Sequence, residues 1–182
     1  MIYFSGCLHL YHSNIIKYCH RPFSSVEEMR EDCLNTIRKI IKPEDTWINL
    51  GDLWCQNEEQ VRDIYNSIKC KEKIFIIGNH DKITLKAQNK YNVFHKTQDY
   101  LELKYKDNFF CCSHYPYLSW NHQNHGAMMI HSHTHAAVDK FNTNCRRMDV
   151  GYDSTKQWLI SIDEVVTKLQ IQPVPSSNTT GS

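Results

Sequence analysis

The sequence lacks the features that mark a membrane protein, a secreted protein or a broad nucleic-acid binder. No apolar run approaches the length that a bilayer span needs. The first residues, Met1 to Phe4, contain no basic segment followed by an apolar stretch, so we expect no signal peptide. Lysine and arginine total 21 and aspartate and glutamate total 20, a net charge of +1. This near balance argues against a broad basic surface for nucleic acid, and we expect no membrane partner.

The eight cysteines lack a CxxC pair and any regular spacing. We therefore favour reduced, mostly buried thiols and a cytoplasmic location over a disulfide framework. A chain of 182 residues is long enough to bury a hydrophobic core in one domain. We expect that single domain to span residues 1–172, and the polar residues 173–182 to form a flexible tail.

The first half of the chain alternates predicted strands with predicted helices. The predicted strands cover residues 2–4, 46–50 and 73–77. Ser25 and Glu28 form a capping-box pattern ahead of the first long helix, which Pro43 should end. Asn57 is expected to cap the next helix. This β-α-β-α-β order indicates parallel strands joined by crossover helices.

The second half reads as shorter strands followed by one helix. The expected strands cover residues 101–105, 108–112, 127–130 and 145–150. The first two of them are separated by a two-residue turn, which predicts a hairpin. Ser161 and Glu164 form a second capping-box pattern at the start of a closing helix over 161–169.

Polar side chains of the kinds that bind metals follow five of these segments. The five motifs are Cys7-Leu8-His9, Gly51-Asp52, Gly78-Asn79-His80-Asp81, Ser113-His114-Tyr115-Pro116 and Ser132-His133-Thr134-His135. Carboxyl ends of strands in α/β sheets gather in one crevice, so these donors should converge. The mixture of imidazoles, carboxylate, amide and thiol suits Zn, Mn, Fe or Ni better than Ca or Mg. Asp52 is the natural bridge between two metals, which could clamp both oxygens of a phosphoryl displacement.

These motifs resemble those of the calcineurin-like metallophosphoesterases, which carry D-x-H, G-D, G-N-H-D or G-N-H-E, a lone His and G-H-x-H in this order. Order and spacing agree over nearly the whole chain. The stretches from His9 to Phe23 and from Asp149 to Asp153 resemble a compact branch often associated with phages or bacteria. The resemblance implies an α/β fold, a four-layer sandwich of two mixed β-sheets flanked by helices.

The resemblance also implies a role for each matching residue, and two divalent metal ions as cofactors. The first ion would be held by Cys7, His9, Asp52 and His135, and the second by Asp52, Asn79, His114 and His133. His80 would be the catalytic histidine, and Asp81 would orient its ring. A hydroxide between the metals would attack phosphorus. The implied function is metal-dependent hydrolysis of a phosphodiester or phosphomonoester, with a nucleotide-like substrate favoured.

The chain departs from the family pattern at four positions in or beside the motifs. Cys7 stands where the family has Asp, Gly6 where it usually has Ser, Tyr11 where it commonly has Gly, and Ser132 where it has Gly. Cys7 could ligate as a thiolate, or it could leave the first site weak or empty. Ser132 matters little unless the backbone there needs a positive φ.

Two more residues are candidates for substrate binding. His12 lies close behind the first motif, and the Arg21 guanidinium matches the geometry of a phosphate. A structural ion pair is an equally good interpretation of Arg21. Two other functions stay open: a metal-binding module with weak or no catalysis because of Cys7, and a nuclease that acts on nucleic-acid ends. The nuclease would use a lysine patch formed by Lys69, Lys71, Lys73, Lys82, Lys86 and Lys90.

Overall fold

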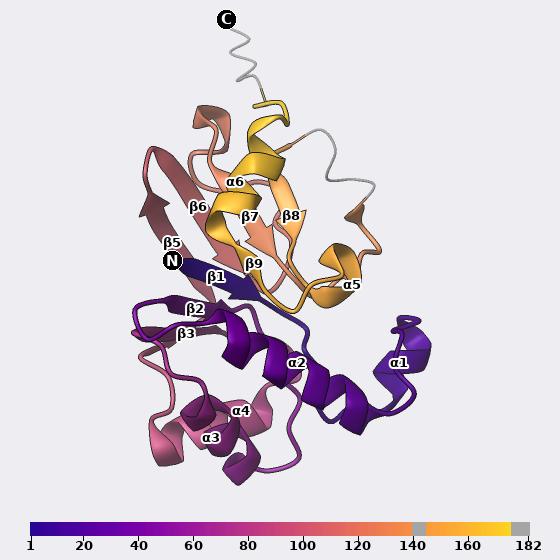
Figure 1. Cartoon of the computed structure of the whole chain (residues 1–182). Coiled ribbons are helices and arrows are strands. Elements are labelled where there is room, and N and C mark those ends of the chain that lie inside the picture. The colour runs from indigo at the N-terminus through magenta and orange to yellow at the C-terminus, as the bar shows by residue number, and fades with distance from the viewer. Residues whose placement is uncertain (140–144, 176–182) are drawn as a thin grey trace, which may run out of the picture.

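Two mixed β-sheets stack face to face in the computed structural model, which describes residues 1–139 and 145–175 (Figure 1). The first sheet has the order β4 (Lys96–Gln98), β3 (Glu72–Ile76), β2 (Thr46–Asn49), β1 (Ile2–Ser5) and β9 (Ile160–Ser161). The second has the order β5 (Tyr100–Tyr105), β6 (Asn108–Ser113), β7 (Met128–His131) and β8 (Arg147–Asp149).

The strand directions bring the motif loops to shared edges of the sheets. Strands β1 to β4 pair in parallel and β9 pairs antiparallel to β1. In the second sheet, β5 and β6 form the predicted antiparallel hairpin, and β6, β7 and β8 are parallel. The predicted mixed α/β architecture is confirmed, and the loops after β1, β2 and β3 leave the same edge of the first sheet.

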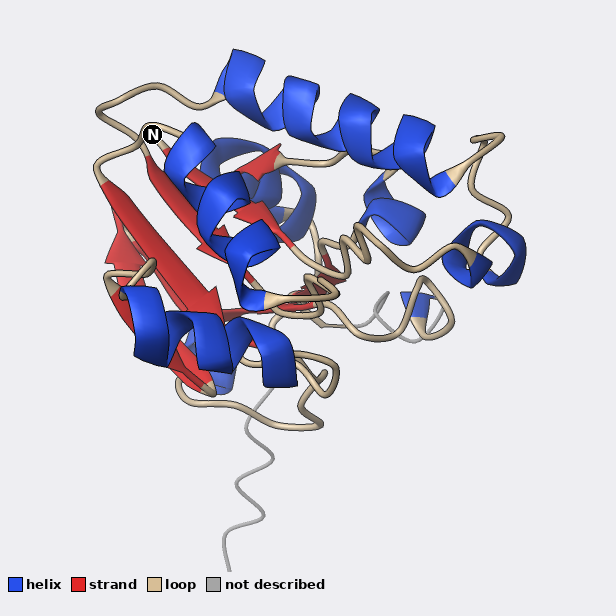
Figure 2. Ribbon diagram, turned by 90° about the horizontal axis from the view of Figure 1, so that it is seen from below, coloured by secondary structure: helices blue, strands red, loops and turns tan. Residues whose placement is uncertain are grey.

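Helices flank the sheets. They are α1 (Asn14–Tyr18), α2 (Val26–Ile40), α3 (Glu58–Ser67), α4 (Lys82–Tyr91), α5 (Tyr152–Thr155) and α6 (Ile162–Gln170), with a 3-10 turn, η1 (Gln123–His125). In Figure 1, α2, α3 and α4 lie on one side of the first sheet and the second sheet lies on the other. Figure 2, seen from below, shows helices in front of the strands. Among the described residues, no helix combines the length and apolar character that a membrane span needs.

Side-chain caps explain where three helices begin. The Asn57 side chain accepts a hydrogen bond from the backbone N–H of Gln60, as predicted. Ser161 and Glu164 form the full capping box. The pattern ahead of α2 is only half a box, because the Glu28 carboxylate accepts hydrogen bonds from Ser24 and not from Ser25. The cap still satisfies backbone donors that the first helical turn leaves free.

Three apolar clusters hold the layers together. Between the sheets lie Phe4, Ile48, Leu50, Ile74, Ile76, Phe110, Cys112, Met128 and Ile130, joined by three side chains of α6. Helix α6 contacts β1, β8 and β9, so it closes an edge of the sandwich. A larger cluster packs α2 and α3 on the outer face of the first sheet. The outer face of the second sheet is covered by a loop around Trp120 and by η1 rather than by a long helix. Of the predicted tail, residues 176–182 lie outside the described residues.

Candidate metal centre

Backbone hydrogen bonds join the loops of the first two motifs. Cys7 N–H donates to the Gly51 carbonyl (2.9 Å), and His9 N–H donates to the Asp52 carbonyl (3.1 Å). Leu10 N–H continues this ladder to the next residue of the second loop. The ladder extends the β1–β2 pairing beyond the sheet, so the side chains of the two motifs are held in a fixed relation.

The ligands predicted for the first metal lie together. The donor atoms of Cys7, His9 and His135 are all within 4.8 Å of one another. Cys7 also belongs to a second group, with Asp52 and His114, whose donor atoms lie within the same distance. His9 Nε2 is 3.8 Å from Asp52 Oδ2. The Cys7 sulfur thus sits where the family has its first aspartate, next to both halves of the centre.

The ligands predicted for the second metal gather around His114. Its Nε2 atom is 3.1 Å from Asn79 Oδ1 and 3.1 Å from His133 Nδ1. The same atom is 3.5 Å from Asp52 Oδ2. One Asp52 oxygen is therefore close to both histidine groups, as a bridging carboxylate must be.

The surroundings of the His9 ring indicate whether these residues could hold a metal. Its side chain is 3% exposed, and neither ring nitrogen has a hydrogen-bond partner among the described residues. Burial, together with the neighbouring His135, lowers the pKa of His9 well below its ordinary value. A buried imidazole without partners is costly, and the neutral form is the one that binds metals. The donor set fits divalent transition-metal ions.

Hydrogen bonds fix which nitrogen two of the histidines present. His114 Nδ1 donates to the Leu50 carbonyl (2.7 Å), and His135 Nδ1 donates to Asp153 Oδ2 (2.6 Å). In each ring the Nε2 lone pair is then left for the centre. Metal-binding histidines are commonly held by a carbonyl or carboxylate in this way.

Arg21 does not reach the substrate side of the site, which corrects the substrate-binding prediction. Its side chain is 0% exposed and donates two hydrogen bonds to Asp153, from Nε (2.9 Å) and Nη2 (2.8 Å). The same guanidinium donates to the carbonyls of Leu8 (3.0 Å) and Cys7 (2.8 Å). The structure therefore agrees with the ion-pair interpretation of Arg21. The guanidinium holds the loop that carries Cys7, and Asp153 holds the ring of His135.

A further cluster beside this ion pair does not fit a metal. Donor atoms of Cys19, His135 and Asp153 lie within 4.8 Å of one another. Both carboxylate oxygens of Asp153 already accept hydrogen bonds from Arg21. The positive charge of the Arg21 guanidinium repels a metal cation at this cluster. We assign this cluster a supporting role.

The Cys7 thiol is buried and has an ordered partner. Its sulfur accepts a hydrogen bond from His133 N–H (3.0 Å). Burial, and then the charges of Asp52 and Asp149, raise the pKa of Cys7 well above its ordinary value. Without a cation the group is a neutral thiol, and a bound divalent metal would favour the thiolate.

Five of the seven predicted metal residues have left-handed backbone conformations. They are Cys7 (φ 49°), His9 (51°), Asp52 (57°), His133 (72°) and His135 (46°). Non-glycine residues rarely adopt this region, and clusters of such residues mark functional sites. Ser132 is not among the described residues with positive φ, so its serine introduces no backbone strain.

Asp81 does not orient the His80 ring, which corrects the second predicted role. The Asp81 carboxylate accepts hydrogen bonds from the backbone N–H groups of Asp52 (2.7 Å), Gly78 (2.8 Å) and Leu53 (3.1 Å). Thr84 Oγ1 adds a fourth (3.1 Å). These donors use both oxygens, so Asp81 holds the second and third motif loops together.

His80 and His12 are both at least partly exposed, and both rings contact Trp54. The ring centroid of His80 is 4.4 Å from that of Trp54, and the His12 ring stacks on Trp54 at 4.2 Å with an interplanar angle of 9°. His80 is exposed and its backbone N–H donates to Asp52 Oδ1 (2.9 Å). Trp54 was not a candidate from sequence, where it is only an aromatic residue two positions after Asp52.

Gly6 and Ser132 depart from the family pattern as a pair. A Cβ atom on Gly6 would lie 2.6 Å from Ser132 Cβ and 2.9 Å from its Oγ. Ser132 Oγ donates to the Leu50 carbonyl (2.6 Å), close to His114. The family pattern that these motifs resemble has serine and glycine at the opposite positions, and in this chain Ser132 occupies the space that a side chain at position 6 would need.

This exchange predicts strong coupling between the two positions. Gly6→Ser alone should destabilise the protein by about 1–3 kcal/mol, because the added atoms meet Ser132 in a packed interior. Adding Ser132→Gly should recover much of that loss. Urea unfolding of both single variants and the double variant measures the coupling, and additive effects would contradict the exchange.

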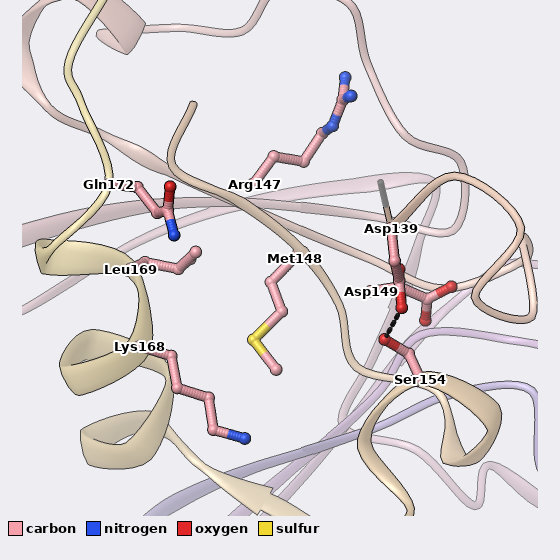
Figure 3. A pocket seen from close by; sticks show the side chains of 8 residues that line it. All are labelled: Asp139, Arg147, Met148, Asp149, Ser154, Lys168, Leu169 and Gln172. Carbon is pink, nitrogen blue, oxygen red and sulfur yellow. Dashed lines mark hydrogen bonds between the residues drawn. The ribbon is translucent and has the colours of Figure 1, made fainter. Parts of the chain in front are cut away.

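A separate cavity of about 200 Å³ lies between β8 and α6 (Figure 3). Its lining includes Asp149, whose carboxylate accepts hydrogen bonds from Thr134 Oγ1 and from Gly151 N–H, both at 2.7 Å. None of the predicted metal residues lines this cavity. Asp149 thus connects the lining of this cavity to the loop of the last motif, which carries His133 and His135.

Comparison with known proteins identifies the family. The model of the calcineurin-like phosphoesterases matches residues 1–177, and the chain belongs to that family. An uncharacterized protein of Methanocaldococcus jannaschii is 29% identical over 175 residues, which cover 93% of this chain and 91% of that protein. The crystal structure of a protein of unknown function from Aquifex aeolicus aligns with a TM-score of 0.72 at 25% identity. This alignment covers 92% of this chain and 98% of that one. Family membership implies metal-dependent hydrolysis of phosphoesters.

Proposed function

We propose that this chain hydrolyses a nucleotide-like phosphodiester or phosphomonoester at a centre of two divalent ions. The observation that carries the proposal is the buried His9 ring, whose two nitrogens have no partner among the described residues. It faces Asp52, whose carboxylate also lies beside His114. This arrangement supports one ligand group on each side of a shared carboxylate.

The protein side chains have distinct roles in this proposal. The first ion would be held by Cys7, His9, Asp52 and His135, and the second by Asp52, Asn79, His114 and His133. Bound divalent metals polarise a phosphoryl oxygen and lower the pKa of water. Cys7 contributes as a thiolate, and His114 and His135 present Nε2 because their Nδ1 atoms are engaged elsewhere.

His80 would give the proton that the leaving oxygen needs. Its ring is exposed at the open side of the centre and its main chain is fixed to Asp52. A positioned general acid contributes about 10²–10⁴-fold to rate. His12, whose ring stacks on Trp54, would contact the part of the substrate that leaves.

The proposal is tested by metal analysis and turnover of bis(p-nitrophenyl) phosphate. We expect two metals per chain, loss of turnover on chelation and recovery when Mn or Zn is added back. His80→Ala should lower kcat by about 10²–10⁴-fold with unchanged metal content. The matched control is His125→Ala, an exposed histidine outside the centre, which should leave kcat unchanged. Activity that survives complete metal removal would exclude the mechanism.

A nuclease is less favoured because part of the proposed lysine patch is engaged. Lys73 Nζ donates to the Tyr65 carbonyl (2.5 Å), and Lys90 pairs with Glu59 at 2.9 Å. A nuclease should bind nucleic acid with an affinity that falls steeply with salt, whereas hydrolysis of small esters should not show this dependence.

A further inference from the structure

We infer that Trp54 is the positioning residue for His80, the role that the family resemblance implied for Asp81. The inference rests on the proposed function, in which His80 protonates the leaving oxygen. It adds to that function a residue outside the metal-binding motifs.

His80 has little else to hold its ring. Within the described part of the chain, no hydrogen bond to the His80 imidazole is found, and Asp81 uses both oxygens on other donors. The ring contacts of His80 are with Trp54, at 4.4 Å between centroids, and with His9, at 6.0 Å. An exposed imidazole without such a wall would sample several rotamers.

Trp54 is itself fixed on two sides. Its carbonyl accepts a hydrogen bond from Tyr11 N–H (3.1 Å), the last rung of the ladder between the first two motif loops. Its backbone φ of 52° is left-handed, a conformation that surrounding structure must enforce. The face-to-face stack on His12 then sets the plane of the indole. The indole contacts both imidazoles, and it limits the positions that the His80 ring can take.

Positioning of an acid has a specific kinetic consequence. In hydrolysis, a water oxygen bonds to phosphorus, the ester P–O bond breaks, and the leaving oxygen takes a proton from His80. The proton from water goes to solvent, from which His80 is recharged. An ester with a poor leaving group depends on this proton more than an ester with a good leaving group. Displacement of the His80 ring should therefore slow the hydrolysis of esters with poor leaving groups most.

The test compares two substrates that differ only in the leaving group. Trp54→Ala should lower kcat for methyl phenyl phosphate by about 10²-fold, but lower it much less for methyl p-nitrophenyl phosphate. KM and the metal content should stay near wild-type values, and Trp54→Phe should restore most of the loss. Tyr18→Ala removes an aromatic ring that is 70% exposed and lies 6.1 Å from the His12 ring, and it should leave the leaving-group dependence unchanged.

A second readout does not depend on turnover. In the metal-free protein, loss of the indole should weaken the nuclear Overhauser effects between the rings of His80 and His9, because the His80 imidazole then samples several rotamers. The His80 signals are identified by their absence in His80→Gln, and Trp54→Phe should weaken these effects less. Equal losses on both esters, or unchanged Overhauser effects, would overturn the inference. If the wild-type protein shows no turnover, the proposed function fails, while the Overhauser effects still decide whether Trp54 positions the ring.

Discussion

Cys7→Ala is expected to reduce the bound metal from two ions per chain to one and to lower kcat by about 10³-fold. The Cys7 sulfur lies within 4.8 Å of the donor atoms of His9 and His135, and the first metal has few other protein donors. Metals contribute several kcal/mol of transition-state stabilisation, and each tenfold in rate corresponds to about 1.4 kcal/mol. Metal analysis and turnover of the purified variant measure both effects.

Two further variants separate ligation from packing. Cys7→Asp restores the family residue and should keep two metals and activity. Cys112→Ala removes another buried thiol, between the sheets, and should leave the metal content unchanged. Two metals retained in Cys7→Ala would show that the sulfur is no ligand. One metal and weak activity in the wild type, both restored by Cys7→Asp, would instead support the metal-binding module.

Cobalt substitution reports on the sulfur directly. Burial raises the pKa of Cys7, so the thiolate forms only where a cation compensates for its charge. With Co²⁺ in the first position, the wild type should show a thiolate-to-cobalt charge-transfer absorption that Cys7→Asp lacks. If the wild-type spectrum shows no such band with two cobalt ions bound, Cys7 does not ligate.

The elements that the sequence predicted best are those whose signals are local. Asn57 and the pair Ser161 and Glu164 act through backbone groups a few residues away, and both caps are present. Strand β4 and the two-residue strand β9 carried no comparable signal, because their pairing depends on neighbours far along the chain. Long-range packing also explains why Cys111 and Cys112 are both buried although they are neighbours on one strand: a loop around Trp120 covers the second face.

The grouping of the candidate metal residues was predictable because each motif follows a strand, and parallel strands bring their ends together. The supporting residues were not, because their roles depend on which atoms face them. Arg21 suited a phosphate by its chemistry but is enclosed against Asp153. Asp81 stands next to His80 in sequence yet binds backbone groups of another loop. The ring that does face His80 belongs to Trp54, from the loop after a different strand.

Asp153→Asn should weaken the first metal position and destabilise the fold together. Asp153 Oδ2 accepts from His135 Nδ1 (2.6 Å) and from Arg21, whose other hydrogen bonds hold the Cys7 and Leu8 carbonyls. Loss of a carboxylate behind a metal-binding histidine costs about 10–100-fold in metal affinity. Removal of one partner of a buried ion pair costs about 3–5 kcal/mol of stability. Metal titration and urea unfolding of the metal-free protein measure the two effects separately.

A matched surface variant and a pH series identify the cause. Asp163 pairs with Lys106 at 2.8 Å on the exposed surface, so Asp163→Asn should change neither the metal affinity nor the free energy of unfolding appreciably.

Burial opposes ionisation of Asp153, but hydrogen bonds from His135 and Arg21 outweigh this effect and hold the pKa of Asp153 below its ordinary value. A depressed folded-state pKa stabilises the fold above the unfolded-state pKa of about 3.9, and this stabilisation is lost as pH falls. The stability gap between wild type and Asp153→Asn should therefore be full near neutral pH and narrow below about pH 4. A gap that stays constant with pH would mean that Asp153 acts through packing and not through its charge.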